Sequence, residues 1–486
     1  MPHVEGTASS ELSERDVRAI LWGLMLAQML AALDTTIVGP AMTTIGRDLG
    51  DYANLPWIVT AYLLVSTTLT PLYGKLSDIH GRRVLLLIAI GSFVAGSIAC
   101  ALSRSMVFLA FSRGLQGIGG AGVTAMTMTI MGDIVPPRDR PKYQFYISIV
   151  WIAANLAGPI LGGYIAGRLH WSLIFWINVP LGLAAWAVTS GRLKSMPRRE
   201  RPHRLDLIGA ALLIAASAST MLGLSWGGQR YAWSSPPLAA LFGASAGFWA
   251  LLVWRQLAAR EPLIPLTVLS NRVVLAGSVA MGFAMASYLG MAIYAPIYFQ
   301  TVAGLSVTAA GAASMPFMMG TTIGAALSVR VMNKVERYWI LPRAGLALAA
   351  ASALALAFST SRWSLMQMEL PLTLIALGVG PIFPVINVSV QSATPPHELG
   401  TSMSLLTFLR NIGAALGVAM FGTIVVDGVA AGLLRAGGDP ALASITFRTI
   451  FIIAALGFVV AFLCLSLVRE PPLRAAPLSE PTLAGE

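Results

Sequence analysis

Long apolar runs, each bounded by charged residues, proline or glycine, follow one another along almost the whole chain. Fourteen such runs occur, at 19–41, 57–73, 84–102, 106–132, 143–167, 172–190, 207–227, 237–254, 273–300, 309–329, 342–360, 368–390, 403–426 and 447–468. A helix needs about 20 apolar residues to cross a bilayer. Lipid offers backbone groups no hydrogen-bond partner, and barrel strands would be shorter and would alternate. The runs therefore predict an all-α polytopic membrane protein with 14 transmembrane helices.

The spacing of the runs divides them into six, two and six. The longest basic segment, 192–204, follows the sixth run, and the next two runs stand apart before another six begin at 273. We therefore predict a cytoplasmic tail at 1–18, a six-helix bundle at 19–190, a basic cytoplasmic linker at 191–206, two extra helices with a loop at 207–272, a second six-helix bundle at 273–468 and a cytoplasmic tail at 469–486. The fifth run of each six is rich in glycine, as an internal repeat of the kind found in transporters would explain.

The placement of basic residues orients these spans. If the N-terminus is cytoplasmic, 23 of the 32 Lys and Arg residues fall on the cytoplasmic side and 7 on the other, while Arg113 and Arg410 lie within spans. This bias follows the positive-inside rule and places both termini in the cytoplasm. The net charge of +11 therefore reflects cytoplasmic loops and not a nucleic-acid partner.

Composition excludes several other classes of protein. Hydrophobic residues make up 56% of the chain and charged residues 11%, against about 25% charged in a soluble protein. A soluble enzyme, a secreted disulfide scaffold and a disordered chain are thereby excluded. The two cysteines, Cys100 and Cys464, lie far apart in apolar runs, so neither a disulfide framework nor a cysteine metal site is expected. The acidic residues near the N-terminus do not fit a secretory signal.

The loop between the second and third runs carries the most specific motif, Gly74-Lys75-Leu76-Ser77-Asp78-Ile79-His80-Gly81-Arg82-Arg83. Its glycines permit a tight turn, and its acid can pair with the arginines or lie at a helix N-terminus. The pattern resembles the signature loop of the major facilitator superfamily. That resemblance implies gating roles for Gly74, Asp78, Gly81, Arg82 and Arg83, with Asp78 expected near 400–402 as a cytoplasmic latch. A charged loop that only fixes topology is the alternative.

Other stretches resemble the same superfamily. Residues 113–120 are similar to its fourth-helix arginine motif, and Gly158-Pro159-Ile160-Leu161-Gly162-Gly163 is similar to its antiporter motif. Residues 33–38, 170–180, 261–265 and 410–413 resemble the 14-helix drug:proton antiporter branch, the EmrB/QacA type. Two positions depart from the branch pattern: Gly39-Pro40 follow the first-helix motif directly, and Ser172 stands where an arginine is usual.

Asp34 is the only acidic residue well inside a predicted span. Burial in lipid disfavours the ionised carboxylate, so this side chain is a candidate to bind and release a proton. Arg113, about two turns into the fourth run, is expected at a similar depth, with Gln116 one turn further on. The three form a predicted proton-coupling site. The alternatives are a carboxylate paired permanently with an arginine, and an arginine that only ties helices together.

The fifth run carries small residues at every fourth position: Ala154, Gly158, Gly162 and Ala166. Such a stripe lets another backbone approach closely, and Pro159 removes one helical hydrogen bond. We expect Gly158, Pro159, Gly162 and Gly163 to act in conformational change, with the stripe at a rocking interface between the bundles. Ordinary small-residue packing is the alternative.

Methionine and aromatic side chains adapt to varied apolar ligands and attract cations. The candidates for substrate contact are Trp57, Tyr62, Met281, Met285, Tyr288, Tyr294 and Tyr298, together with Arg410. Packing or lipid contact is the alternative for the first seven. For Arg410 the alternative, which we favour, is hydrogen bonding to neighbouring carbonyls.

The chain has no Gly-Lys-Ser/Thr phosphate loop and no zinc-binding histidine motif. We therefore expect neither an enzyme nor a cofactor or metal. The resemblance implies a proton-coupled antiporter of the cytoplasmic membrane that exports amphiphilic organic compounds by alternating access, with protons and lipid as its other partners and a periplasmic adaptor protein as one to consider. The alternatives are an exporter of a specific metabolite or organic anion with the same fold, proton-coupled uptake, and a non-transporting membrane sensor.

Overall fold

The computed structural model describes residues 14–51, 54, 57–136, 139–193, 206–228, 230–259, 262, 265–305, 307–332, 337–358, 364–430 and 440–470. Most of the predicted linker at 191–206 and most of both predicted tails lie outside these residues, as does part of the motif at 261–265. The described residues are helical except for connections and one isolated β-bridge between Gly227 and Tyr231. The all-α prediction is confirmed for this part of the chain.

Two groups of helices flank a central pair. The first bundle consists of α1 (Glu14–Leu49), α2 (Trp57–His80), α3 (Arg82–Ala101), α4 (Met106–Ile134), α5 (Arg140–Arg168), α6 (Leu173–Trp176) and α7 (Asn178–Arg192). The pair is α8 (Leu207–Trp226) and α9 (Pro236–Ala258). After the short α10 (Leu266–Ser270), the second bundle consists of α11 (Arg272–Thr301), α12 (Val307–Ala313), α13 (Met315–Met332), α14 (Ile340–Ala357), α15 (Leu365–Val379), α16 (Ile382–Ala393), α17 (Leu399–Ala430) and α18 (Pro440–Ser466).

By length and hydropathy, 12 helical segments within the described residues qualify as membrane spans, not the 14 expected. The two runs that do not qualify are α2 and α4, which are nevertheless 24 and 29 residues long. Their composition explains the difference, because α2 carries several threonines with Lys75 and Asp78, and α4 carries six glycines with Arg113 and Asp133. The count of 14 is therefore not supported on this criterion.

The two bundles repeat one packing scheme. In the first, α1 packs against α5, α2 against α4 and α3 against α7. In the second, α11 packs against α17, α13 against α15 and α14 against α18, so the same sequential positions pair again. An internal repeat accounts for this correspondence.

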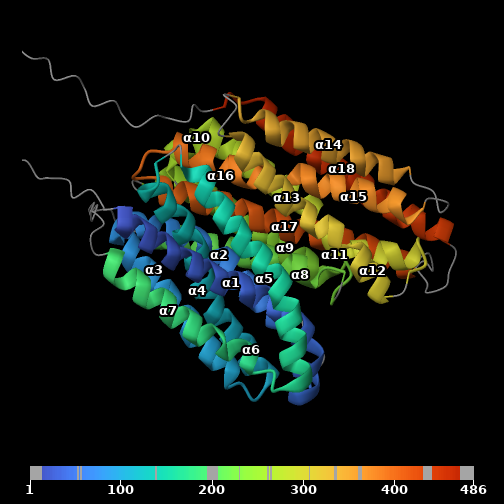
Figure 1. Ribbon diagram of the computed structural model, residues 1–486, viewed down its shortest axis with the longest axis horizontal. Coiled ribbons are helices and arrows are strands. Elements are labelled where there is room, and N and C mark those ends of the chain that lie inside the picture. The colour runs from blue at the N-terminus through green and yellow to red at the C-terminus, as the bar shows by residue number, and fades with distance from the viewer. Residues whose placement is uncertain are drawn as a thin grey trace, which may run out of the picture.

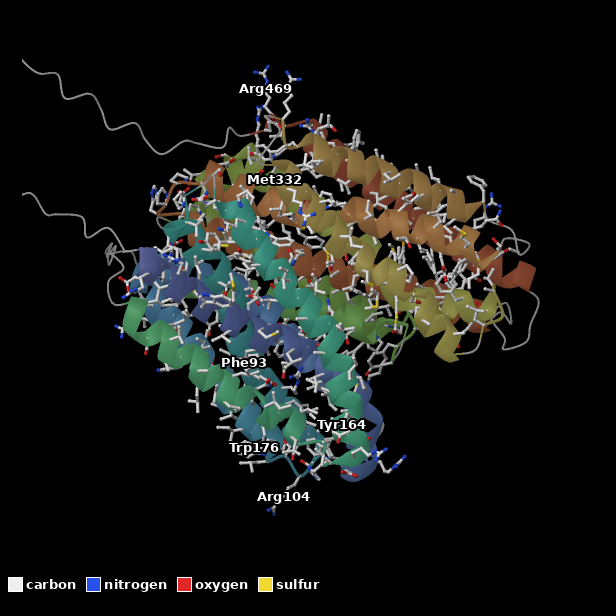
Figure 2. All side chains as sticks on the ribbon, in the orientation of Figure 1. Phe93, Arg104, Tyr164, Trp176, Met332 and Arg469 are labelled. Atoms are coloured by element: carbon white, nitrogen blue, oxygen red, sulfur yellow. The ribbon has the colours of Figure 1, made fainter. Side chains whose placement is uncertain are left out.

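The bundles converge at one end and separate toward the other (Figure 1). They meet near α10 and α16, and they diverge toward α6 and α12. Contacts at the convergent end include a hydrogen bond of 3.1 Å from Gln391 Nε2 to the Met128 carbonyl, and one of 3.3 Å from Arg140 Nη1 to Ser392 Oγ. Arg104 and Trp176 lie at the opposite, free end of the first bundle (Figure 2).

The pair α8–α9 lies across the line where the two bundles meet. α8 contacts both α2 and α17, and Trp249 of α9 packs on Phe408 of α17 with ring centroids 6.2 Å apart. Asp206 holds the pair together, because it caps α8 through the Gly209 amide at 3.0 Å and accepts from Arg255 Nη2 of α9 at 3.0 Å. Burial opposes ionisation, but the hydrogen bonds from Arg255 and Gly209 outweigh it and lower the pKa of Asp206.

Close backbone approach in the second bundle depends on glycine. A Cβ atom added at Gly413 would overlap the Gly282 carbonyl, and one added at Gly417 would overlap the Ala286 carbonyl. The backbones of α11 and α17 thus touch directly, in the manner of small-residue helix packing in membranes.

We predict that Gly417→Ala lowers the free energy of unfolding by about 1–3 kcal/mol, because the added methyl group must displace a carbonyl of α11. Thermal unfolding in detergent measures the change. Gly247→Ala on α9 is the matched control, since a Cβ there meets nothing within 4 Å. The control should be neutral or stabilising by up to about 1 kcal/mol. Equal effects at the two positions would contradict the close contact.

Candidate functional site: a buried carboxylate network

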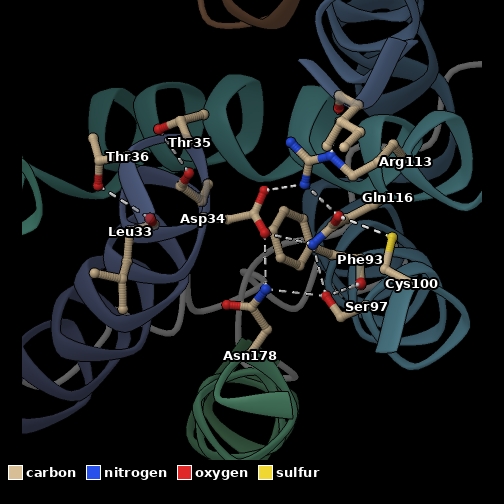
Figure 3. A network of polar contacts seen from close by, with 12 residues as sticks. Leu33, Asp34, Thr35, Thr36, Phe93, Ser97, Cys100, Arg113, Gln116 and Asn178 are labelled. Carbon is tan, nitrogen blue, oxygen red and sulfur yellow. Dashed lines mark hydrogen bonds and ion pairs between the residues drawn. The ribbon is translucent and has the colours of Figure 1, made fainter. Parts of the chain in front are cut away.

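Asp34 lies in α1 and is completely buried, with 0% of its surface exposed. Figure 3 shows donors around both carboxylate oxygens. Oδ2 accepts from Arg113 Nη1 at 2.6 Å, and Oδ1 accepts from Gln116 Nε2 at 2.8 Å and from Asn178 Nδ2 at 2.9 Å. Because all three neighbours donate, the arrangement fits the ionised carboxylate, which only accepts.

Arg113 on α4 is equally enclosed, with 2% of its surface exposed. Its Nε donates to the Ile58 carbonyl of α2 at 2.8 Å, and its Nη1 also donates to Gln116 Oε1 at 2.6 Å. The guanidinium carbon lies 4.5 Å from the centre of the Tyr62 ring, a cation–π distance. The positive charge of Arg113 is therefore stabilised by a backbone carbonyl, an amide oxygen, a carboxylate and an aromatic ring.

A second layer completes the network. Gln116 Nε2 donates to Ser97 Oγ at 2.8 Å, and Ser97 in turn donates to the Phe93 carbonyl at 2.9 Å. Cys100 lies against Gln116 Oε1, with the sulfur 3.6 Å from the oxygen. Side chains or carbonyls of α1, α2, α3, α4 and α7 thus meet at Asp34, and all five helices belong to the first bundle.

The structure brings Asp34, Arg113 and Gln116 together, as the sequence predicted, but sequence reasoning missed Asn178 and Ser97. Asn178 stands in the motif Ile177-Asn178-Val179-Pro180, which carried the family resemblance without a role for the amide. A signal was present, since Asn178 is the one amide side chain in the run 172–190. Ser97 offers no such signal, because serine is common in these helices.

The small-residue stripe on α5 faces α1 of the same bundle, so its predicted place between the bundles is wrong. A Cβ at Gly158 would overlap Thr36, and one at Gly162 would overlap the Ile37 carbonyl. Thr36 Oγ1 also donates to the Ala154 carbonyl at 2.9 Å. Gly163 lies at a looser contact with α1, and α5 continues through Pro159. The stripe therefore fixes the part of α1 directly after Asp34.

Asp78 connects the two bundles at their convergent end. Its Oδ2 accepts from the Thr401 backbone amide at 3.2 Å and from Thr401 Oγ1 at 2.9 Å, within the segment expected from the sequence. Arg82 Nη1 donates to the other oxygen of Asp78, while Arg82 Nε donates to Asp133 Oδ2 at 2.8 Å. The carboxylate thus lies at the beginning of α17, where the helix dipole favours an anion.

The remaining loop residues shape this contact. Gly74 and Gly400 let α2 and α17 touch, since a Cβ at Gly74 would overlap the Gly400 carbonyl. Gly81 separates α2 from α3 with φ of +89°, a conformation that side chains disfavour. Arg83 instead holds the first bundle together, donating from Nε to the Ser190 carbonyl at 3.1 Å.

The candidate substrate residues fall into different environments. Tyr62 belongs to the carboxylate network, and Trp57 packs edge-on against Trp226 of α8 at 6.3 Å. Met281 and Tyr298 are buried in the core of the second bundle, Tyr298 between Phe447 and Phe451. Met285, Tyr288, Tyr294 and Arg410 are half-buried. Tyr288 lies 3.2 Å from Thr321 Oγ1, and Tyr294 donates to the Val418 carbonyl at 3.2 Å.

Comparison with known proteins identifies the family. Residues 24–418 match the model of the Major Facilitator Superfamily, so this chain belongs to that superfamily of membrane-embedded transporters, which are not enzymes. The chain is 31% identical over 409 residues to the multidrug transporter protein MdtP of Bacillus subtilis, covering 84% of this chain and 75% of that protein. It is also 31% identical over 416 residues to the efflux pump FUS6 of Gibberella fujikuroi, covering 82% and 74%.

Other relatives are longer. An uncharacterized MFS-type transporter of Mycobacterium tuberculosis is 31% identical over 411 residues, which cover 84% of this chain but 59% of that relative. Among solved structures, the human organic anion transporter MFSD10 (TETRAN) gives a TM-score of 0.65 at 18% identity, covering 91% of this chain and 99% of that one. The proton:xylose symporter XylE gives 0.62 at 14% identity, covering 91% and 95%. At these identities the likeness shows the fold alone.

We predict that Asp78→Asn loosens the convergent end, because the anion is lost from the start of α17 and from Arg82. Spin labels at His80→Cys and His397→Cys, in a Cys464→Ser background, should show a longer or broader distance distribution by double electron–electron resonance. Asp139→Asn, an exposed acid beside α5, is the matched control and should leave the distribution unchanged. An unchanged distribution in both variants would argue against a latch.

Proposed function

We propose that this protein is a proton-coupled antiporter that exports amphiphilic organic compounds by alternating access. The observation that carries the proposal is the buried network in which Asp34 is ion-paired to Arg113 and hydrogen-bonded to Gln116. An ionisable group inside a membrane is expensive and is retained where it moves charge. The names of related multidrug and efflux transporters support the direction of transport.

We further propose that α2 and α4 cross the membrane with the 12 qualifying spans, which gives 14 as in the EmrB/QacA type of drug:proton antiporter. Their 24 and 29 residues correspond to about 36 and 44 Å at 1.5 Å per residue, more than the roughly 30 Å of hydrocarbon. Their polar residues are directed inward: Arg113, Gln116 and Thr67 are all buried. The basic bias supports a cytoplasmic location for both termini and for the convergent end, in the cytoplasmic membrane.

In this proposal, the ion pair between Asp34 and Arg113 is the group whose charge changes during the transport cycle. A proton that binds Asp34 neutralises the carboxylate and removes its attraction for Arg113. Arg113 then keeps the Ile58 carbonyl, Gln116 and the rings of Tyr62 and Phe175 as partners. The arrangement of α1 and α4 with the lowest free energy therefore differs between ionised and protonated Asp34. This difference couples proton binding to substrate transport.

Substrate would be met by the half-buried residues of α11, chiefly Met285 and Tyr288. A flexible thioether and a ring with one polar atom suit amphiphiles of varied shape. Met281 and Tyr298 support these residues from within the bundle and are not expected to touch substrate.

We predict that Asp34→Asn abolishes proton-driven export in proteoliposomes with an imposed pH gradient, because the amide cannot carry a proton between the two sides. Substrate exchange without a gradient should persist. The substitution leaves Arg113 without its counter-ion, which costs about 3–5 kcal/mol in a buried pair. The double variant Asp34→Asn/Arg113→Gln removes both charges and serves as the control for folding. Export by Asp34→Asn that still consumes the gradient would refute the role of the carboxylate.

A second function, export of organic anions, is favoured by Arg410. Among the described residues its guanidinium has no hydrogen bond or ion pair, so the expected bonding to neighbouring carbonyls is not observed. Leu409 and Gly413 on one side of it face α11, and Phe408 on the other faces α9. The half-buried Arg410 thus lies on a face of α17 that is turned toward neither α11 nor α9, and we propose that an anionic group of the substrate pairs with it there.

The two functions make different predictions for the effect of Arg410→Gln on substrate affinity. If the substrate is anionic, its Kd should rise by a factor of about 10–100, since hydrogen bonds to charged groups contribute roughly 1.5–3 kcal/mol. Arg410→Lys should restore part of the affinity. Binding of cationic dyes should be unaffected in either variant. Equal losses for anions and cations would instead indicate a structural role for the arginine.

A further inference from the structure

A buried amide beside Asp34 is satisfied at one end only. Asn178 is 1% exposed, and its Nδ2 donates to Asp34 Oδ1 at 2.9 Å and to Ser97 Oγ at 3.3 Å. Its Oδ1 is buried without a hydrogen-bond partner in the described part of the chain. Buried polar atoms are rarely left unpaired, so an orphan acceptor against an ionisable carboxylate requires a physical explanation.

The other amide of the network cannot take two orientations. Gln116 Oε1 accepts from Arg113 Nη1 at 2.6 Å, while its Nε2 donates to Asp34 and Ser97. Turning this amide over would direct its NH₂ group at the guanidinium, donor against donor. No such contact fixes the oxygen of Asn178, so its amide is held only by the hydrogen bonds that Nδ2 donates to Asp34 and Ser97 and is the one that can turn.

Protonation of Asp34 changes what the carboxyl group needs. An ionised carboxylate only accepts, whereas a carboxylic acid must place one O–H on an acceptor. Arg113 and the Nε2 of Gln116 are donors and cannot serve. A half-turn of the Asn178 amide exchanges its nitrogen and oxygen, which brings Oδ1 to the position now 2.9 Å from Asp34 Oδ1. That distance suits an O–H···O hydrogen bond.

We propose that Asn178 is a positioning residue for proton binding, whose amide donates to the ionised Asp34 and, turned over, accepts from the protonated Asp34. The inference rests on the proposed function, in which Asp34 carries the proton. Both protonation states of the carboxyl group are then hydrogen-bonded at the same site. The proton is thus held on the Oδ1 side, while Oδ2 continues to face Arg113.

Other groups near Asp34 restrict how the proposal is tested. The charged or titratable side chains that face it are Arg113 from α4, Tyr62 from α2 and Cys100 from α3. The helices α5 and α7 carry charged residues only near their ends, and α6 carries none. A readout specific to a carboxylic acid is therefore needed, because a transport rate would mix contributions from all of these groups.

The experiment is infrared difference spectroscopy of the full-length protein in liposomes, recorded between high and low pH. In the wild-type protein we expect a carboxylic acid C=O band that disappears in Asp34→Asn. In Asn178→Leu this band should move to higher wavenumber, as for an acid whose O–H has lost its acceptor. In wild-type protein grown with isotope-labelled asparagine, a label-sensitive amide band should change together with the acid band, which tests the turn without any substitution.

Asn387→Leu, a buried amide on α16 of the other bundle, is the matched control and should alter neither band. If no acid band depends on Asp34, the proposed function fails. If the band depends on Asp34 but neither Asn178→Leu nor the asparagine label affects the spectra, the role of Asn178 fails while the proposed function stands.

Discussion

The structure depends on one buried pair of opposite charges inside the first bundle. Taking a carboxylate and a guanidinium out of water costs several kcal/mol per ion, and their attraction offsets this only when further hydrogen bonds satisfy the remaining lone pairs and protons of the two ions. Here α2 supplies a carbonyl to Arg113, α4 and α7 supply amides to Asp34, and α3 supplies Ser97 to the amides. The packing of these helices is therefore constrained by polar contacts as much as by apolar ones.

Two of the helices that hold this pair, α2 and α4, also contact the second bundle. α2 carries Ile58 and Tyr62 at the network and Asp78 at the convergent end. α4 carries Arg113 at the network and, near the convergent end, Asp133, which accepts a hydrogen bond from Arg82. Each helix is continuous between its two sites. In the proposed cycle, a change in the charge pair that shifts α2 would also move Asp78 relative to Thr401, so α2 is the element through which the two sites would be coupled.

How far the sequence predicted the site depended on the kind of residue. Asp34 and Arg113 were found because charge inside an apolar run is rare and expensive, so each stands out alone. Asn178 carries no charge, and its contact with Asp34 depends on which atoms face it in three dimensions. Likewise, a small-residue stripe shows that a helix face allows close approach, but the periodicity does not say that α1 is the helix that approaches Gly158 and Gly162.

The fold was predicted to a similar extent. Apolar length located the helices, but it did not show that the run 309–329 is interrupted at Ser314 or that the run 368–390 is interrupted at Gly380 and Pro381. It also treated α2 and α4 like the others, although their polar and glycine content sets them apart. No stretch of either helix reaches the hydropathy at which the other spans qualify, and both helices carry polar residues of the network and of the contact between the bundles.

The central pair α8–α9 follows from the same constraint. If α2 crosses the membrane, as we propose, its polar residues must stay away from lipid, yet α2 lies at the edge of the first bundle, where it meets α17. Leu213 of α8, Leu252 of α9 and Phe408 of α17 form an apolar cluster that also contains Leu72 of α2. α8 contacts both bundles, and the ion pair between Asp206 and Arg255 holds α8 and α9 together. The two helices therefore cover the line between the bundles jointly. In the proposed arrangement of 14 spans, the two helices beyond the pair of six-helix bundles would shield α2 from lipid along this line of contact.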